Sequence, residues 1–345
     1  MHGHASPRGR RLAKVSRTPV ADNQKGRRIC LALQGGGSFG AFTWGVLDRL
    51  LEEDDLAIDT VSGAGAGSVN AVVMAAGLIA GGKPEARRCL DRFWKRSSET
   101  APPDFGPAAT VFTDMTSRWM SPYQSNPFNH DVLSKLLAKA VDFEALRSRP
   151  PFKLLVAATS VTNGTTRIFR ETELAREMVL ASTCLPMKAH AIEIAGTRYW
   201  DGGYSANPPL IPLVEASEAS ELLVVQIMPT RGHEQPRTAP DIVRRLEQVT
   251  FNGVLQREMA TLGTMMELSA KAADEPGLGG RLHRLRLHHL SAEDHYPSLN
   301  DESTTDLDWR FLLRLRSAGR AAAETWLVGK PRDCVRHDAS LRSVG

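Results

Sequence analysis

Two glycine-rich turns, each between a short apolar segment and a helical one, constrain the fold most strongly. Residues 29–33 (ICLAL) form an unbroken apolar run, followed by the glycine loop at residues 35–40 and then by apolar residues at helical spacing. Residues 58–62, the turn at residues 63–67 and the small-residue segment 68–80 repeat this plan. Strand, glycine turn and helix in this order predict two successive units of a parallel α/β sheet.

The rest of the chain extends this pattern. Apolar runs predict further strands at residues 152–160, 166–169, 191–194, 197–200 and 222–228. Helical spacing predicts helices at residues 68–80 (ended by Gly81 and Gly82), 174–182, 241–273 and 308–328, with Gly253 and Met259, Met265 and Met266 as helix-packing residues. Residues 281–289 alternate basic and apolar side chains, and 282–287 are predicted as an amphipathic edge strand with a solvated basic face.

We found no internal repeat, so the sequence predicts one three-layer α/β domain with a largely parallel central sheet. Its expected parts are a disordered basic leader at residues 1–27, a core at residues 28–230, and a helical extension at residues 231–345 that packs on the core and ends in disordered residues.

The charge is unevenly distributed. Residues 1–28 hold eight Lys and Arg against one acid, which leaves 35 basic and 38 acidic residues in the body. A body without a basic excess argues against a nucleic-acid partner. The leader has no apolar run, so it is neither a secretory signal nor a membrane span. We expect a solvated segment, with contact to an anionic membrane surface as the alternative.

Cysteine and histidine usage points to no metal or cofactor. The four cysteines (Cys30, Cys89, Cys184 and Cys334) show no CxxC pair, and the ten histidines form no HExxH motif. Scattered thiols of this kind are expected to stay reduced in a cytoplasmic protein. The sequence predicts no particular oligomeric state.

The first glycine loop fits more than one chemistry. Its GxGxxG spacing matches a dinucleotide site, but the nearby acid, Asp59, lies at the start of the second strand instead of its end. A tight turn without a ligand is the second alternative. The third is an oxyanion site made by the backbone N–H groups of Gly35, Gly36, Gly37, Ser38 and Gly40 at a helix N-terminus.

The second turn favours the oxyanion alternative. A G-x-S-x-G elbow holds a nucleophilic serine in a strained turn between a strand and a helix. Gly63 and Gly67 occupy the two flanking positions of that pattern, and the central position is Gly65.

With both glycine turns, the chain resembles the patatin-like phospholipase family, and in particular its bacterial cytoplasmic members. The segments that carry the resemblance are LALQGGGSFGAFTWGVLDRL, SGAGAGSVNAVVMAAGL, SNPFN, ASTCLP and YWDGGYSANPPLIPL, in this order along the chain. The segment from Asp308 to Leu327 is similar to the C-terminal extension of those members.

The resemblance implies a three-layer fold, a Ser–Asp dyad without histidine, and carboxylic ester or phospholipid substrates. Asp201, followed by Gly202 and Gly203, matches the dyad carboxylate, and Gly36, Gly37 and Ser38 match the oxyanion loop. Phe39 departs from the pattern, because many relatives have a basic residue there.

Gly65 is the departure that matters most, because glycine cannot form an acyl-enzyme. Loss of a serine nucleophile costs on the order of 10⁶-fold in rate. We therefore expect an inactive or severely impaired lipid acyl hydrolase, whether the change is engineered or natural. A lipid-binding or regulatory pseudoenzyme is the alternative, and a Rossmann oxidoreductase is a distant third. Ser68 and Ser62 are candidate substitute nucleophiles, although Ser68 is better explained as a helix-capping or packing residue.

Overall fold

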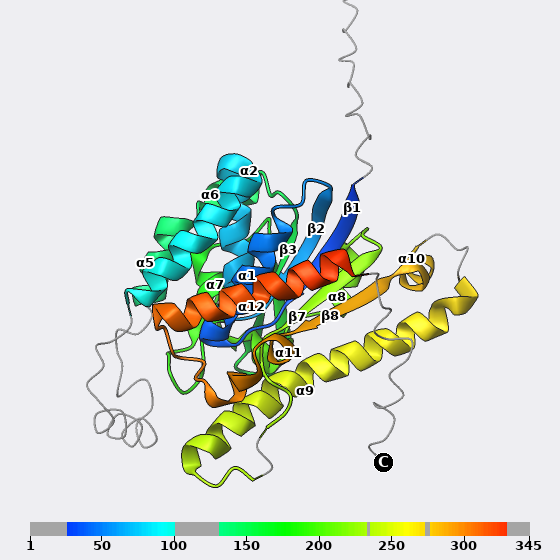
Figure 1. Cartoon of the computed structure of the whole chain (residues 1–345). Coiled ribbons are helices and arrows are strands. Elements are labelled where there is room, and N and C mark those ends of the chain that lie inside the picture. The colour runs from blue at the N-terminus through cyan, green and yellow to red at the C-terminus, as the bar shows by residue number, and fades with distance from the viewer. Residues whose placement is uncertain (1–25, 101–130, 233–234, 273–276, 330–345) are drawn as a thin grey trace, which may run out of the picture.

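The computed structural model describes residues 26–100, 131–232, 235–272 and 277–329 (Figure 1). Residues 1–25 of the leader predicted at residues 1–27, the SNPFN motif at residues 125–129 and the predicted disordered end of the chain after residue 329 lie outside these ranges. Arg27, predicted as part of the leader, is instead the first residue of a strand.

Eight strands form one mixed sheet. They are β1 (Arg27–Leu33), β2 (Leu56–Gly63), β3 (Lys153–Ser160), β4 (Thr166–Arg170), β5 (Ile192–Ile194), β6 (Thr197–Asp201), β7 (Glu221–Gln226) and β8 (Arg286–Ser291). The order is β5-β6-β3-β2-β1-β7-β8, and β4 pairs with β3. The five strands β3, β2, β1, β7 and β8 are parallel, whereas β4, β5 and β6 pair antiparallel. The predicted largely parallel α/β fold is confirmed.

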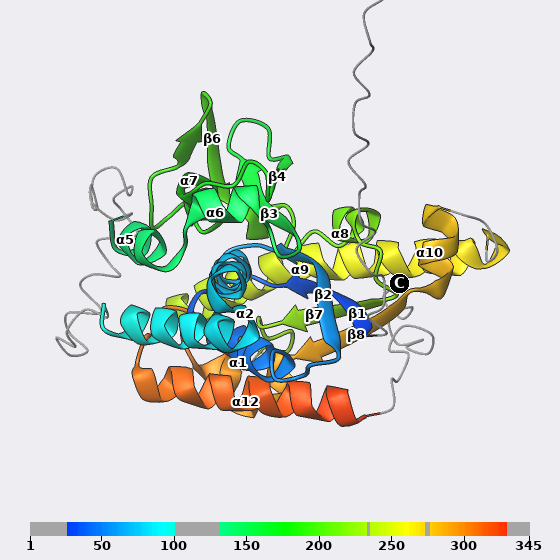
Figure 2. The ribbon, with the colours of Figure 1, turned by 90° about the horizontal axis from the view of Figure 1, so that it is seen from above.

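The helices lie on both faces of the sheet. They are α1 (Gly40–Leu50), α2 (Ala66–Ser98), α5 (Asp131–Ala140), α6 (Phe143–Ser148), α7 (Arg176–Ser182), α8 (Ile211–Ala216), α9 (Ala239–Leu268), α10 (Leu278–Arg284), α11 (Ala292–His295) and α12 (Trp309–Val328), with short 3₁₀ turns η1 (Gly37–Phe39), η2 (Gly202–Tyr204), η3 (Ser269–Ala272) and η4 (Pro297–Asp301). Figure 2 shows α1, α2 and α12 on one side of the parallel strands and α8, α9 and α10 on the other.

Alternating side chains of the central strand supply the two cores. Ile29, Leu31 and Leu33 of β1 belong to the apolar cluster with α1, α2 and α12, whereas Cys30 and Ala32 belong to the cluster with α8, α9 and α10. Successive residues of a strand point to opposite faces, so a short strand buried on both sides must be apolar throughout. This explains the unbroken apolar run at residues 29–33.

The strand order fixes where a ligand can bind. The chain passes from β1 outward to β2 and β3, and later returns to the other side of β1 with β7 and β8. In open α/β sheets the crevice lies at the carboxyl ends of the strands where this direction reverses. The glycine loop follows β1 and the elbow follows β2, so both lie at that edge.

One further sequence-based boundary was wrong. The strand predicted at residues 282–287 is instead the end of α10 followed by β8, because Leu278 and Leu282 are spaced four apart and both pack into the α8–α9–α10 cluster. The helix predicted at residues 68–80 begins two residues earlier, at Ala66, and its backbone leaves helical geometry at Gly81 and Gly82, as predicted. A second helical stretch follows this kink and ends at Ser98.

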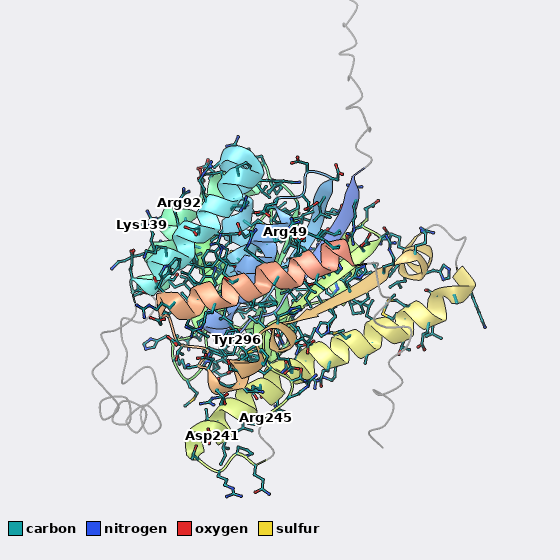
Figure 3. All side chains as sticks on the ribbon, viewed as in Figure 1. Arg49, Arg92, Lys139, Asp241, Arg245 and Tyr296 are labelled. Atoms are coloured by element: carbon teal, nitrogen blue, oxygen red, sulfur yellow. The ribbon has the colours of Figure 1, made fainter. Side chains whose placement is uncertain are left out.

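The segment after residue 230 contributes more than helices. β8 pairs with β7 over six residues, and α12 packs along α1, where Arg49 of α1 forms an ion pair with Glu324 (Figure 3). The buried carboxylate of Asp48 in α1 also accepts hydrogen bonds from Arg316 and Arg320 of α12. These contacts tie the C-terminal helix to the helix that follows the glycine loop. The division at residue 230 stays a prediction.

Candidate active site

The elbow at residues 63–67 has the backbone of a strained strand-to-helix turn. Gly65 adopts φ 51° and ψ −126°, which side-chain-bearing residues rarely adopt. A Cβ on Gly67 would lie 2.0 Å from the carbonyl oxygen of Leu33, and one on Gly63 would lie 2.6 Å from the backbone nitrogen of Ser68. The two flanking positions therefore require glycine because strand and helix approach so closely there.

The central position is different because it has room for a side chain. A Cβ on Gly65 would lie 3.3 Å from Oδ2 of Asp201, 3.3 Å from Cα of Gly35 and 3.6 Å from Oδ1 of Asp201. These separations are close to van der Waals contact, so neighbouring atoms would shift by only a few tenths of an ångström. A side chain at position 65 would thus point at the carboxylate predicted from the sequence.

Asp201 ends β6, the strand that pairs antiparallel with the carboxyl end of β3. Its carboxylate is 6% exposed, and Oδ1 accepts a hydrogen bond of 2.7 Å from the N–H of Gly203. Burial raises the pKa of Asp201 to about 7, against the opposing effect of that hydrogen bond. A carboxyl group with this pKa can take up and release a proton near neutral pH.

The two glycines after Asp201 hold it in place. A Cβ on Gly202 would lie 2.2 Å from the carbonyl oxygen of Ala157 in β3, and one on Gly203 would lie 2.4 Å from the ring of Phe251 in α9. Together they form the turn η2, for which Asp201 is the N-cap. The Asp-Gly-Gly sequence is therefore a tight turn and a carboxylate support at once.

Of the five glycine-loop residues proposed as oxyanion donors, three already donate within the protein. Gly35 N–H bonds Oδ1 of Asn207 at 2.8 Å, Ser38 N–H bonds the carbonyl of Thr304 at 2.8 Å, and Gly40 N–H bonds carbonyls within the loop. This narrows the candidate donors to Gly36 and Gly37, which both line the cavity described below.

Phe39, where many relatives have a basic residue, turns away from the loop. It is buried against Phe311 of α12, with ring centroids 6.2 Å apart. The side chain therefore belongs to the core beneath α1 and α12.

Sequence reasoning missed one residue of the elbow, Ala66, and one residue that holds the elbow in place, Ser182. Ala66 is the first residue of α2, so its N–H has no acceptor within the helix and lies where an elbow supplies a second oxyanion donor. Ser182, at the end of α7, accepts the N–H of Gly65 with both its carbonyl oxygen (3.0 Å) and its Oγ (3.2 Å). The position after Gly65 and the ASTCLP segment were the signals that could have identified them.

Neither alternative serine faces the cavity. Ser68 is fully buried and its Oγ donates to the carbonyl of Gly65 at 2.7 Å, which fits the expected packing role. Ser62 is fully buried at the end of β2. In this geometry neither hydroxyl can act as the nucleophile.

A cavity of ≈ 400 Å³ opens over the elbow, the glycine loop and Asp201. This volume falls in the range of small-molecule sites. Its lining is largely apolar, and the apolar members are Ala66, Val69, Phe93, Trp94, Val132, Leu133, Leu136, Leu185, Phe251 and Leu307. An apolar chamber with the carboxylate of Asp201 and the backbone donors of the glycine loop at its floor suits an ester with an acyl chain.

The dinucleotide alternative lacks its key contact. Asp59 is bound at the amino end of the sheet, where it accepts hydrogen bonds from Ser217 Oγ and from Glu218 N–H. It therefore cannot reach a ribose at the glycine loop. In the part of the chain that the structure describes, no three His, Cys, Asp or Glu side chains gather as metal ligands.

Comparison with known families decides the ancestry. The family model described as Patatin-like phospholipase matches residues 31–214, more than half of the chain. The chain belongs to the patatin-like phospholipase family. It therefore has the scaffold of a lipid acyl hydrolase, and lipid esters are the substrates of that family.

Other comparisons add less. No curated protein matches the chain. Among solved structures, VipD from Legionella pneumophila matches with 14% identity and a TM-score of 0.37, over 84% of this chain and 67% of that one.

Proposed function

We propose that this chain is a Ser–Asp-dyad lipid acyl hydrolase whose nucleophile position is Gly65 and whose dyad carboxylate is Asp201, so that its acyl-enzyme route is closed. The observation that carries the proposal is the 3.3 Å separation between the Cβ position of residue 65 and Oδ2 of Asp201. A serine Oγ one bond further out would come within hydrogen-bonding reach of that oxygen.

With serine at position 65, each remaining group has a role. Asp201 would accept the serine proton as Oγ attacks the ester carbonyl, and its pKa of about 7 suits that transfer. The N–H groups of Gly36, Gly37 and Ala66 would stabilise the oxyanion. Asp201 would return the proton to the leaving alcohol, and water would then release the acyl group as a carboxylic acid.

The test is reversion of position 65. We would compare the chain with Gly65→Ser and with the double variant Gly65→Ser plus Asp201→Asn on esters of increasing acyl length. Strong activity and covalent labelling by a fluorophosphonate in the single revertant alone would support the dyad. Equal hydrolysis by the unreverted chain and the revertant would refute the assignment of position 65.

A non-catalytic lipid-binding function is the second candidate, and the apolar cavity favours it. The cavity keeps its apolar lining without any serine at its floor. If no variant hydrolyses any ester while the chain still binds a fatty acid, the binding function is supported and the dyad proposal fails.

We extend the proposal to peripheral contact with an anionic lipid surface in the cytoplasm. Four apolar side chains on the first half of α9 are exposed, namely Ile242 (44%), Val243 (46%), Leu246 (60%) and Val249 (53%). Glu247 and Phe251 of the same helix line the cavity, so this exposed apolar surface lies close to it. Helices with an exposed apolar stripe and basic residues bind in the plane of a membrane.

Basic residues accompany the stripe. Arg237, Arg244, Arg245 and Arg257 lie on or beside α9, and Figure 3 labels Arg245 and Asp241 near its N-terminal end.

The described cysteines, Cys30, Cys89 and Cys184, are free thiols, which supports a reducing compartment.

A further inference from the structure

Gly65 leaves a defined space next to the dyad carboxylate. Apart from residues 64–66 themselves, the nearest atoms to its Cβ position are Oδ2 of Asp201 and Cα of Gly35, both at 3.3 Å, and a water would stand further out, about where a serine Oγ would lie. Gly65 and Asp201 both line the cavity, so this space is open to a bound ester. A water oxygen is similar in size to the hydroxyl that a serine would place there, and it needs polar partners such as this carboxylate.

We propose that this chain hydrolyses carboxylic esters in a single displacement, in which a water molecule held by Asp201 in the space beside Gly65 attacks the ester carbonyl directly. The inference rests on the proposed function, because it uses the same cavity, carboxylate and oxyanion donors. It differs in the nucleophile and in the absence of a covalent intermediate.

The step balances without any other reactant. The water oxygen forms a bond to the carbonyl carbon while one water proton moves to Oδ2 of Asp201. The tetrahedral oxyanion is stabilised by the backbone N–H groups of Gly36, Gly37 and Ala66. Its collapse breaks the bond to the leaving oxygen, which receives the proton from Asp201. One carboxylic acid and one alcohol leave, and Asp201 is again a carboxylate.

The surroundings of Asp201 suit this role. Its pKa of about 7, raised by burial, makes it a stronger base than an exposed carboxylate while it is still ionised above neutral pH. The nearby serines do not compete for the position. Ser68 Oγ donates to the carbonyl of Gly65, and Ser182 Oγ accepts the N–H of Gly65.

The direct route should be slow. A positioned general base contributes about 10²- to 10⁴-fold, whereas loss of a serine nucleophile costs on the order of 10⁶-fold. We expect turnover on the order of 10³-fold or more below that of Gly65→Ser, rising as the pH passes through about 7 and Asp201 ionises. Product should form linearly from the first turnover.

The experiment compares four proteins on a chromogenic acyl ester, namely the chain itself, Gly65→Ser, Gly65→Ala and Asp201→Asn. The methyl of Gly65→Ala would lie 3.3 Å from Oδ2, between the backbone and the water, and would push the water away from the carboxylate, whereas Asp201→Asn removes the base but keeps a similar shape. Thermal unfolding checks that each variant is folded. Fluorophosphonate treatment separates true water attack from traces of protein carrying serine.

The expected result is hydrolysis by the chain without a burst, insensitive to fluorophosphonate, and about 10²-fold lower in Asp201→Asn and in Gly65→Ala. Hydrolysis that persists in Asp201→Asn, or that fluorophosphonate abolishes, would overturn the inference. The inference would also be overturned if Gly65→Ser were active while the unchanged chain hydrolysed the ester no faster than Asp201→Asn does. In that case the proposed function would survive. An inactive Gly65→Ser would instead refute the proposed function itself.

Discussion

Asp201→Asn should stabilise the protein, and the gain should grow with pH. The carboxyl group is 6% exposed, and burial raises its pKa from 3.8 to about 7. Between these two pH values the folded state binds more protons than the unfolded state, so stability falls as the pH rises. A difference of roughly three pKa units corresponds to about 4 kcal/mol, which is an upper estimate for the penalty above pH 7.

The asparagine variant avoids this penalty because its side chain is neutral at every pH. Its Oδ1 can still accept the N–H of Gly203. We expect nearly equal melting temperatures at pH 4, where the carboxyl is protonated in the folded chain, and an Asn variant several degrees more stable at pH 8.

The measurement is thermal unfolding of both proteins at matched ionic strength from pH 4 to pH 8. Asp59→Asn is the matched control, because hydrogen bonds from Ser217, Glu218 and Thr60 outweigh burial and lower the pKa of Asp59. That variant should be destabilised most near neutral pH, the opposite sign. A melting-temperature difference for Asp201→Asn that does not change with pH would refute the reasoning.

Three further predictions follow from single contacts. Gly67→Ala should destabilise by about 3 kcal/mol or more and Gly65→Ala by only about 1–2 kcal/mol in denaturant unfolding, because the new methyl meets Leu33 O at 2.0 Å in the first and nothing nearer than 3.3 Å in the second. Glu221→Gln should destabilise by about 2–3 kcal/mol at pH 7 and less at pH 3. Against the effect of burial, the hydrogen bond with His288 and the ion pairs with Arg27 and Arg286 lower the pKa of this carboxyl to about 2, and equal losses at both pH values would contradict this. Leu246→Ser plus Val249→Ser should reduce co-sedimentation with vesicles rich in anionic lipid without changing the melting temperature, whereas unchanged binding would remove the role of α9.

The fold was predictable because its strands are apolar on both faces. The side chains of residues 29–33 point to both faces of the sheet and are apolar on both. They can all be buried only if helices cover both faces. The spacing of apolar residues did not identify the element type where the same segment fits both the helical and the strand period. In residues 278–287 leucines occur both four apart and two apart, and only packing against α8 and α9 decides that the helix extends to Arg284.

The motifs that form the candidate site could be predicted from the sequence, but the individual backbone N–H groups that serve as oxyanion donors could not. The spacing of Gly63, Gly65 and Gly67 predicts an elbow, because close contact of strand and helix leaves no alternative to glycine at its flanks. Which loop N–H groups face a substrate depends on partners distant in sequence. Asn207 accepts the hydrogen bond from the N–H of Gly35, and Thr304 accepts that from the N–H of Ser38. No local sequence pattern connects these residues.

Gly65 separates two energetic costs that an active elbow carries together. A serine at φ 51° and ψ −126° costs on the order of 1–2 kcal/mol in backbone strain, and glycine adopts these angles without that strain. The buried carboxylate of Asp201 keeps its own cost, because no side chain at position 65 donates a hydrogen bond to it. Gly65→Ser should therefore add strain at the elbow while its hydroxyl lowers the pKa of Asp201. The two effects oppose each other in stability, and only the second also changes the pH at which Asp201 can act as a base.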